Sequence, residues 1–118
     1  MINLDYTSRT PIYEQIVNEF ERYVALGVLK PNQKMESVRE LALNLGINPN
    51  TVKKAYDELE RRHVITTIST KGTFIADDTK SITKLKIDEK LGIIKAEIAE
   101  LEKLGISREE IISKLREN

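Results

Sequence analysis

The residues most able to do chemistry in this sequence form a short polar run that follows Gly46. The run contains two asparagines, a threonine and two lysines, which are Asn48, Asn50, Thr51, Lys53 and Lys54. An asparagine amide can form two hydrogen bonds with adenine, a threonine methyl group can contact the methyl group of thymine, and a lysine can reach guanine or a phosphate. These residue types suit the reading of DNA, provided that one element holds them on an exposed face.

Each of these polar residues also has a simpler interpretation. Asn48 is a good helix cap, with or without an additional contact to phosphate. Lys53 and Lys54 are also typical of an ordinary solvated helix surface. Contact with DNA is favoured over these simpler roles only if the fold turns the side chains outward together.

The sequence predicts two short helices around the polar run, joined by a turn that contains glycine. The first begins at Ser37, which forms a capping box with Glu40. The second is expected over about 49–62, with Asn48 as its cap and Pro49 in its first position. Apolar residues at helical spacing are expected to face inward: Val38, Leu41, Ala42, Leu45, Val52, Ala55, Tyr56 and Leu59. Such a pair is a helix-turn-helix, whose second helix enters the major groove of DNA.

Another helix is predicted before this pair and a β-hairpin after it. Thr10 is expected to cap the earlier helix, with Pro11 in its first position, and residues 28–35 are expected only to connect. The inward residues of that helix are predicted to be Ile12, Ile16, Val17, Phe20, Tyr23, Val24 and Leu26. Residues 64–76 hold two β-branched runs, which indicate a hairpin with Gly72 at or near its turn. The predicted fold class is mainly α with a small β-hairpin, a winged helix-turn-helix.

Two further residues with positive charge are candidates for contacts with the DNA backbone. Arg39 is expected on the outer side of its helix, where it could bind phosphate or pair with an acid; phosphate is favoured because Glu40 is occupied by capping. Lys71 at the hairpin tip is expected to contact the minor groove or the backbone of DNA, and Gly72 lets the turn approach the DNA closely. The whole chain has 19 basic and 19 acidic residues, but residues 30–72 have eight basic residues against five acidic ones.

The region 79–118 carries a different apolar pattern. Its apolar residues are spaced alternately by four and three positions: Ile87, Leu91, Ile94, Ile98 and Leu101. This spacing predicts a long helix that dimerises through a coiled-coil seam. Gly105 is expected to end it, and Ser107 with Glu110 forms a capping box for a last short helix. The chain is thus expected to have a DNA-binding domain at 1–78 and a dimerisation region after it. The alternative is that the stripe packs back on the first domain.

Composition excludes several kinds of site. The chain has no cysteine and one histidine, His63, which is expected to be structural or interfacial at a helix end. We therefore expect no metal, no cofactor and no enzymatic activity. No run of 18 apolar residues suggests a membrane span, and the N-terminus does not resemble a signal peptide. The expected location is the cytoplasm.

Five motifs follow one another along residues 10–75: P-I-Y-x-Q-I, G-x-L-x-P, S-V-R-E-L-A, N-P-N-T-V-x-x-A-Y-x-E-L-E and K-G-T-F. With these motifs in this order, the segment resembles the DNA-binding domain of the GntR family of bacterial transcription regulators. The short C-terminal region is similar to that of the YtrA-like subfamily, which carries two helices in place of the large ligand-binding domains of longer relatives.

The resemblance implies a homodimeric repressor or regulator, often of transporter operons. Such a dimer is expected to bind a near-palindromic double-stranded DNA operator. The resemblance places DNA contacts on the following residues: Arg39, Asn48, Asn50, Thr51, Lys53, Lys71 and Gly72. Two residues depart from the family pattern: Pro49 stands where many members have arginine, and Glu36 where proline is usual. The first departure removes a bidentate contact to guanine.

Two further expectations concern partners. A small-molecule effector, if the protein has one, is expected in a crevice between domains or subunits. The rival function is a winged-helix module that binds another protein instead of specific DNA. Binding that weakens steeply with salt distinguishes DNA from a protein partner.

Overall fold

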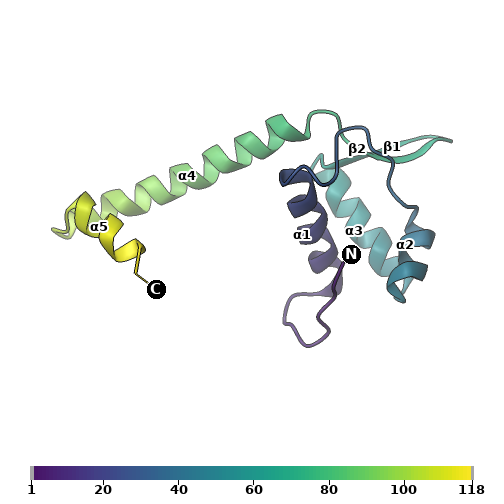
Figure 1. Ribbon diagram of the computed structural model, residues 1–118, viewed down its shortest axis with the longest axis horizontal. Helices are drawn as coiled ribbons and strands as arrows, with labels where there is room; N and C mark the ends of the chain where they lie inside the picture. The colour runs from purple at the N-terminus through teal and green to yellow at the C-terminus, as the bar shows by residue number, and fades with distance from the viewer. Residues whose placement is uncertain (1, 118) are drawn as a thin grey trace. The chain divides into compact units, whose positions relative to one another are not determined.

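The computed structural model describes residues 2–117, without the side chains of residues 80 and 81. The described elements, in chain order, are α1 (Ile12–Ala25), α2 (Val38–Leu45), α3 (Pro49–Arg61), β1 (Ile65–Ile68), β2 (Gly72–Ile75), α4 (Thr79–Lys103) and α5 (Arg108–Leu115) (Figure 1). They form two compact units, Met1–Ile82 and Thr83–Asn118. The predicted fold class, mainly helical with one small hairpin, is confirmed.

The central element of the first unit is α3, which packs against both α1 and α2. The largest fully buried side chains come from α1, α3 and β2: Ile16, Val17, Val52, Leu59 and Ile75. Phe20 of α1 meets Tyr56 of α3 edge to face, with ring centroids 6.1 Å apart. The inward residues predicted for α3 are all buried, so its polar face is turned outward.

The start and end of α1 differ from the prediction. Pro11, not Thr10, is the N-cap, and no side chain caps the helix there. Thr10 instead offers its carbonyl oxygen to Gln15 Nε2 at 2.9 Å, so Gln15 secures the preceding loop. The inward position predicted for Leu26 is wrong, because the helix ends at Ala25 and Leu26 is exposed.

The caps of α2 and α3 match the prediction. Ser37 Oγ accepts from the Glu40 N–H at 3.1 Å, and Glu40 Oε1 accepts from the Ser37 N–H at 3.2 Å. Gly46 ends α2 with φ +68°, a left-handed conformation that favours glycine. Asn48 Oδ1 accepts from the Asn50 N–H at 2.8 Å and caps α3. These local bonds set the angle at which α3 leaves the turn.

The hairpin formed by β1 and β2, here named the wing, contains more backbone pairing than the sequence predicted. β1 and β2 are antiparallel, with Ile68 opposite Gly72. Residues 32–35, expected only to connect, lie along the other edge of β2. There the Met35 N–H donates to the carbonyl oxygen of Thr73 at 2.8 Å, and Lys34 forms a β-bridge with Phe74. The connector therefore ties the wing to the helical core.

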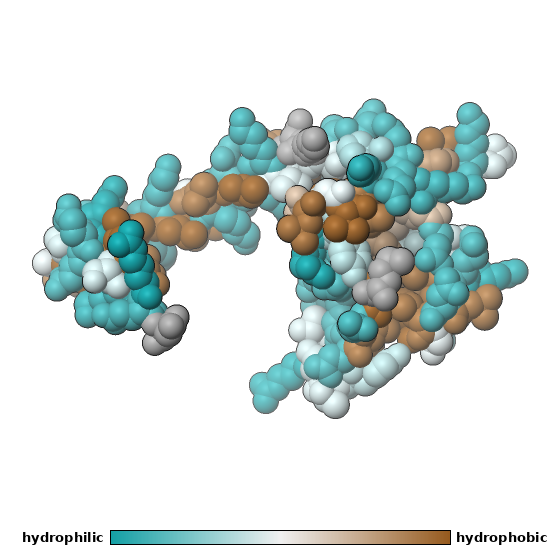
Figure 2. Space-filling view, in the orientation of Figure 1, coloured by the Kyte–Doolittle hydropathy of each residue, from teal (hydrophilic) through white to brown (hydrophobic). Residues whose placement is uncertain are grey.

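The second unit is built from most of α4 together with α5. Ser107 Oγ accepts from the Glu110 N–H at 3.2 Å, which is one half of the predicted capping box; among the described residues the reciprocal bond is not formed. Ile111 is buried, with 3% of its surface exposed. Figure 2 shows apolar surface along α4. No helix in the described part of the chain combines the length and apolarity needed to cross a bilayer.

Candidate nucleic-acid interface

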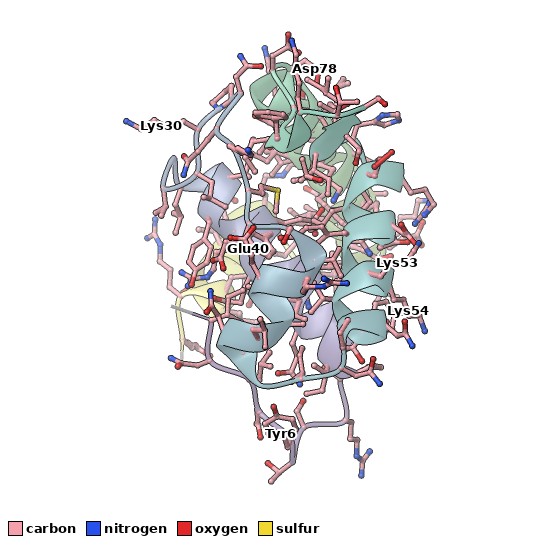
Figure 3. The ribbon with its side chains drawn as sticks, turned by 90° about the vertical axis from the view of Figure 1, so that its right-hand side faces the viewer. Tyr6, Lys30, Glu40, Lys53, Lys54 and Asp78 are labelled. Carbon is pink, nitrogen blue, oxygen red and sulfur yellow. The ribbon has the colours of Figure 1, made fainter. Side chains whose placement is uncertain are left out.

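The predicted polar run lies on the outer edge of α3 and at its N-terminus. Asn50, Lys53 and Lys54 are exposed, whereas Thr51 is half-buried. Figure 3 shows Lys53 and Lys54 at the outer edge of the helix. The helix N-terminus adds the positive end of the helix dipole, which attracts phosphate; its first N–H groups, those of Asn50 and Thr51, are bonded to Asn48. This edge therefore combines donors, acceptors and positive charge on one surface.

Lys53 forms an ion pair that the sequence analysis did not assign. Its Nζ lies 2.9 Å from Asp57 Oδ2, and both side chains are 65% exposed. An exposed pair of this kind contributes about 0–1 kcal/mol, so a phosphate can displace Asp57 at small cost. The spacing of four residues on one helix was a usable signal for this pair.

Lys54 is also engaged within the chain. Its Nζ lies 4.1 Å from the ring centroid of Tyr13 on α1, a cation–π contact. Tyr13 is half-buried. Burial raises the pKa of Tyr13, so the phenol stays neutral beside the lysine at neutral pH. Lys54 thus links α1 to α3 while its charge stays near the outer edge.

The remaining predicted contacts lie on α2, the turn before α3 and the wing. Arg39 is exposed on α2 and has no ion-pair partner among the described residues, so the alternative of an acidic partner is not realised there. Lys71 is exposed in the hairpin turn. Gly72 has φ +121°, and a Cβ at this position would lie 3.1 Å from Lys34 Cε. Lys34, which was not singled out from the sequence, brings a further positive charge alongside β2.

Arg61 and Arg62 belong to the basic excess of the sequence but are bound by acids. Glu58 accepts hydrogen bonds from both arginines. Arg62 also donates to Glu21 of α1 at 2.8 Å and so joins the two helices. These hydrogen bonds lower the pKa of Glu58 to about 2. Two of the eight basic residues therefore stabilise the fold.

An acidic depression lies beside the wing. A cavity of about 540 Å³ is lined in part by Glu60, His63, Asp77 and Asp78. His63 is exposed and adopts a left-handed conformation with φ +62° just after α3, away from the outer edge of that helix. Within the described residues no group of three or more His, Cys, Asp or Glu side chains could hold a metal ion. This face lacks the positive charge that would suit phosphate.

A second cavity, of about 370 Å³, lies within the first unit between the N-terminal segment, α1 and α2. Its lining is mixed and includes Ile2, Phe20, Met35, Leu41 and Asn44. Its volume falls in the range of small-molecule sites. The effector site expected between domains or subunits remains a prediction.

The predicted apolar stripe of α4, here named the α4 seam, consists of Ile87, Leu91, Ile94, Ile98 and Leu101. Four of these side chains are between 40% and 53% exposed, and Ile98 is half-buried. Leu85 and Ile93 of α4, and Leu104 directly after it, are exposed as well, so the apolar surface is wider than a single stripe. So much exposed apolar surface on one helix is typical of an interaction site.

Comparison with known proteins gives consistent results. Residues 12–75 match the family described as bacterial regulatory proteins, gntR family. The chain is 46% identical over 101 residues to the HTH-type transcriptional repressor YtrA of Bacillus subtilis, an alignment that covers 86% of this chain and 75% of that protein. The crystal structure of a transcriptional regulator from Oenococcus oeni is 42% identical, with a TM-score of 0.75 over 98% of this chain and 96% of the other.

A further solved structure contains DNA. It is the AraR DNA-binding domain in complex with the operator ORX1, which is 26% identical and has a TM-score of 0.56 over 63% of this chain and 92% of that one. All of these similar proteins are described as regulators of transcription or as DNA complexes.

Proposed function

Because this chain belongs to the GntR family and is a DNA-binding transcriptional regulator and not an enzyme, we propose that it is a homodimeric repressor of a near-palindromic operator. In this proposal residues 1–78 bind DNA and residues 79–118 hold two copies together. Residues 49–62 enter the major groove, and the hairpin at 64–76 contacts the backbone or the minor groove.

The observation that carries the proposal is the outer edge of α3. Asn50 and Lys53 are exposed there, while the opposite face of the helix is buried against α1 and α2. Asn50 is the residue suited to base recognition through its amide, and Lys53 the one suited to phosphate or guanine. Exposed Arg39 and Lys71 supply charge for further backbone contacts.

The homodimer is supported by the exposed α4 seam. A dimer that binds two half-sites one turn of DNA apart must hold its two copies of α3 about 34–36 Å apart. In the proposal the second unit sets this separation. A small molecule that binds between subunits and favours another arrangement would then switch operator binding.

The test uses the matched lysines Lys53 and Lys103. Each forms an exposed intrahelical pair with an acid, Lys53 with Asp57 and Lys103 with Glu100 at 3.3 Å. Footprinting upstream of the protein's own gene first defines the operator. Lys53→Ala is then expected to weaken operator binding about fivefold to tenfold and to lower the slope of log K against log salt by about 1.

Lys103→Ala removes the same charge from the other unit and is expected to leave both quantities unchanged. Equal effects of the two substitutions would contradict the assigned contact. Salt-insensitive binding of the wild-type chain to a protein partner, with no protected operator, would support the protein-interaction module instead.

A further inference from the structure

Four charged residues flank the α4 seam, two on each side. With Leu91 at position a of a heptad repeat, Asp88 and Lys95 occupy e positions. Lys90 and Glu97 occupy g positions on the other side of the seam. All four side chains are exposed, and none forms an ion pair within the described part of the chain. Their charges are therefore available to a partner that covers the seam.

We propose that this partner is α4 of a second copy of the chain, packed in antiparallel orientation with the two-fold axis between Gly92 and Ile93. The proposal rests on the homodimer proposed above and adds its orientation and register. Charges at e and g positions set the orientation of paired helices, so the four residues can be compared in each arrangement.

A parallel dimer brings like charges together. In that arrangement a g residue faces the e residue of the following heptad on the other helix. Lys90 would face the partner's Lys95, and Glu97 would face the partner's Glu102. The contact between the two lysines is repulsive, and symmetry doubles it. The repulsion at Glu102 is reduced, because that carboxylate accepts a hydrogen bond from Arg108 of its own chain at 3.1 Å.

The antiparallel dimer brings opposite charges together. In that arrangement g residues face g residues, and e residues face e residues. With the axis between residues 92 and 93, Lys90 faces the partner's Glu97 and Asp88 faces the partner's Lys95. A shift of one heptad in either direction sets Lys90 against the partner's Lys90, or Glu97 against the partner's Glu97. The charges therefore favour one register over its neighbours.

The same register covers the apolar side chains. Leu91 lies opposite the partner's Ile94, and Ile87 lies opposite the partner's Ile98, so each copy covers the seam of the other. The two Thr79 residues, where α4 begins, are then separated by 27 residues of helical rise, about 40 Å. A parallel pair would instead hold the two helix starts about 10 Å apart.

Charge reversal tests the orientation, because the two arrangements predict opposite signs. We expect Lys90→Glu to weaken dimerisation about tenfold, measured by sedimentation equilibrium at low salt. The double variant Lys90→Glu/Glu97→Lys is expected to restore it. Tighter dimerisation of Lys90→Glu would contradict the proposal, because that substitution relieves the repulsion of the parallel form. An unchanged dissociation constant would contradict the assigned contact.

Cysteine cross-linking gives a second measurement, since the chain has no cysteine of its own. In the proposed register Lys84 lies opposite the partner's Leu101. A mixture of Lys84→Cys and Leu101→Cys chains is expected to form a covalent dimer on oxidation, and Lys84→Cys alone is not. Cross-linking of Lys84→Cys alone would contradict the antiparallel orientation while leaving the homodimer intact. A wild-type chain that sediments as a monomer would overturn the homodimer itself.

Discussion

The two units of this chain differ in where they bury their apolar side chains. The first unit buries residues of α1, α2, α3 and the wing against one another, and Ile16, Val17, Val52, Leu59 and Ile75 have almost no exposed surface. In the second unit Ile111 is buried, while most of the α4 seam is exposed. Burial of apolar surface is the main favourable contribution to folding. The first unit is therefore stabilised by apolar contacts within the chain, whereas the second leaves apolar surface that a partner can bury.

The largest effect should come from matched truncations in the two units. Leu59→Ala empties a fully buried position, and we expect it to lower the free energy of unfolding by about 2–5 kcal/mol. Leu91→Ala removes the same atoms from an exposed position, and we expect a change below about 1 kcal/mol in a dilute, monomeric sample. Urea denaturation followed by circular dichroism measures both.

The two substitutions should have the opposite order of effect on dimerisation. Leu91→Ala is expected to weaken dimerisation about 100-fold, because each dimer loses two buried leucine side chains worth about 1.5 kcal/mol each. Leu59→Ala, at a concentration where it is folded, should dimerise normally. A large loss of monomer stability in Leu91→Ala would show that the seam packs within its own chain.

A second test concerns the acid–base network that joins α1 to α3. The pKa of Glu58 is about 2 in the folded chain, below its ordinary value of 4.5, because Arg61 and Arg62 donate hydrogen bonds to its carboxylate. A depressed pKa means that the network stabilises the fold fully above about pH 4.5 and loses this contribution as the pH falls toward 2.

The measurement is the urea midpoint of the first unit's transition between pH 7 and pH 2. We expect the midpoint of the wild-type chain to fall across this range more steeply than that of Glu58→Gln, which carries no titrating carboxyl at this position. Parallel curves for the two chains would show that Glu58 does not contribute to acid sensitivity.

The parts of the fold that were predictable from the sequence are those set by local bonds. Ser37 with Glu40, and Asn48 with the N–H two residues later, are caps whose partners lie within three positions. Gly46 ends α2 because few other residues adopt its left-handed conformation. These short-range signals were sufficient to identify the helix-turn-helix.

The features that were missed depend on residues far apart in the chain. The pairing of residues 32–35 with β2 joins segments about 40 residues apart, and a short polar connector carries no alternation that reveals it. The contact between Lys54 and Tyr13 depends on how α1 crosses α3. The pair Lys53–Asp57, in contrast, was readable from its spacing.

The candidate site was therefore predictable as a set of residues but not as a set of partners. The outer edge of α3 was predictable, because the inward face of this helix is marked by apolar residues at helical spacing. The contacts of Lys53 and Lys54 within the chain, and the binding of Arg61 and Arg62 by Glu58, were not predicted.

The most direct test of the account is the ratio of affinities for the mapped operator and for a scrambled duplex of the same length, measured at one salt concentration. For Asn50→Ala we expect this ratio to fall by about 5-fold to 100-fold, since a bidentate contact to a base contributes about 1–3 kcal/mol of discrimination. Affinity for the scrambled duplex should stay the same, because Asn50 carries no charge. A ratio equal to that of the wild-type chain would contradict the claim that the outer edge of α3 reads the operator.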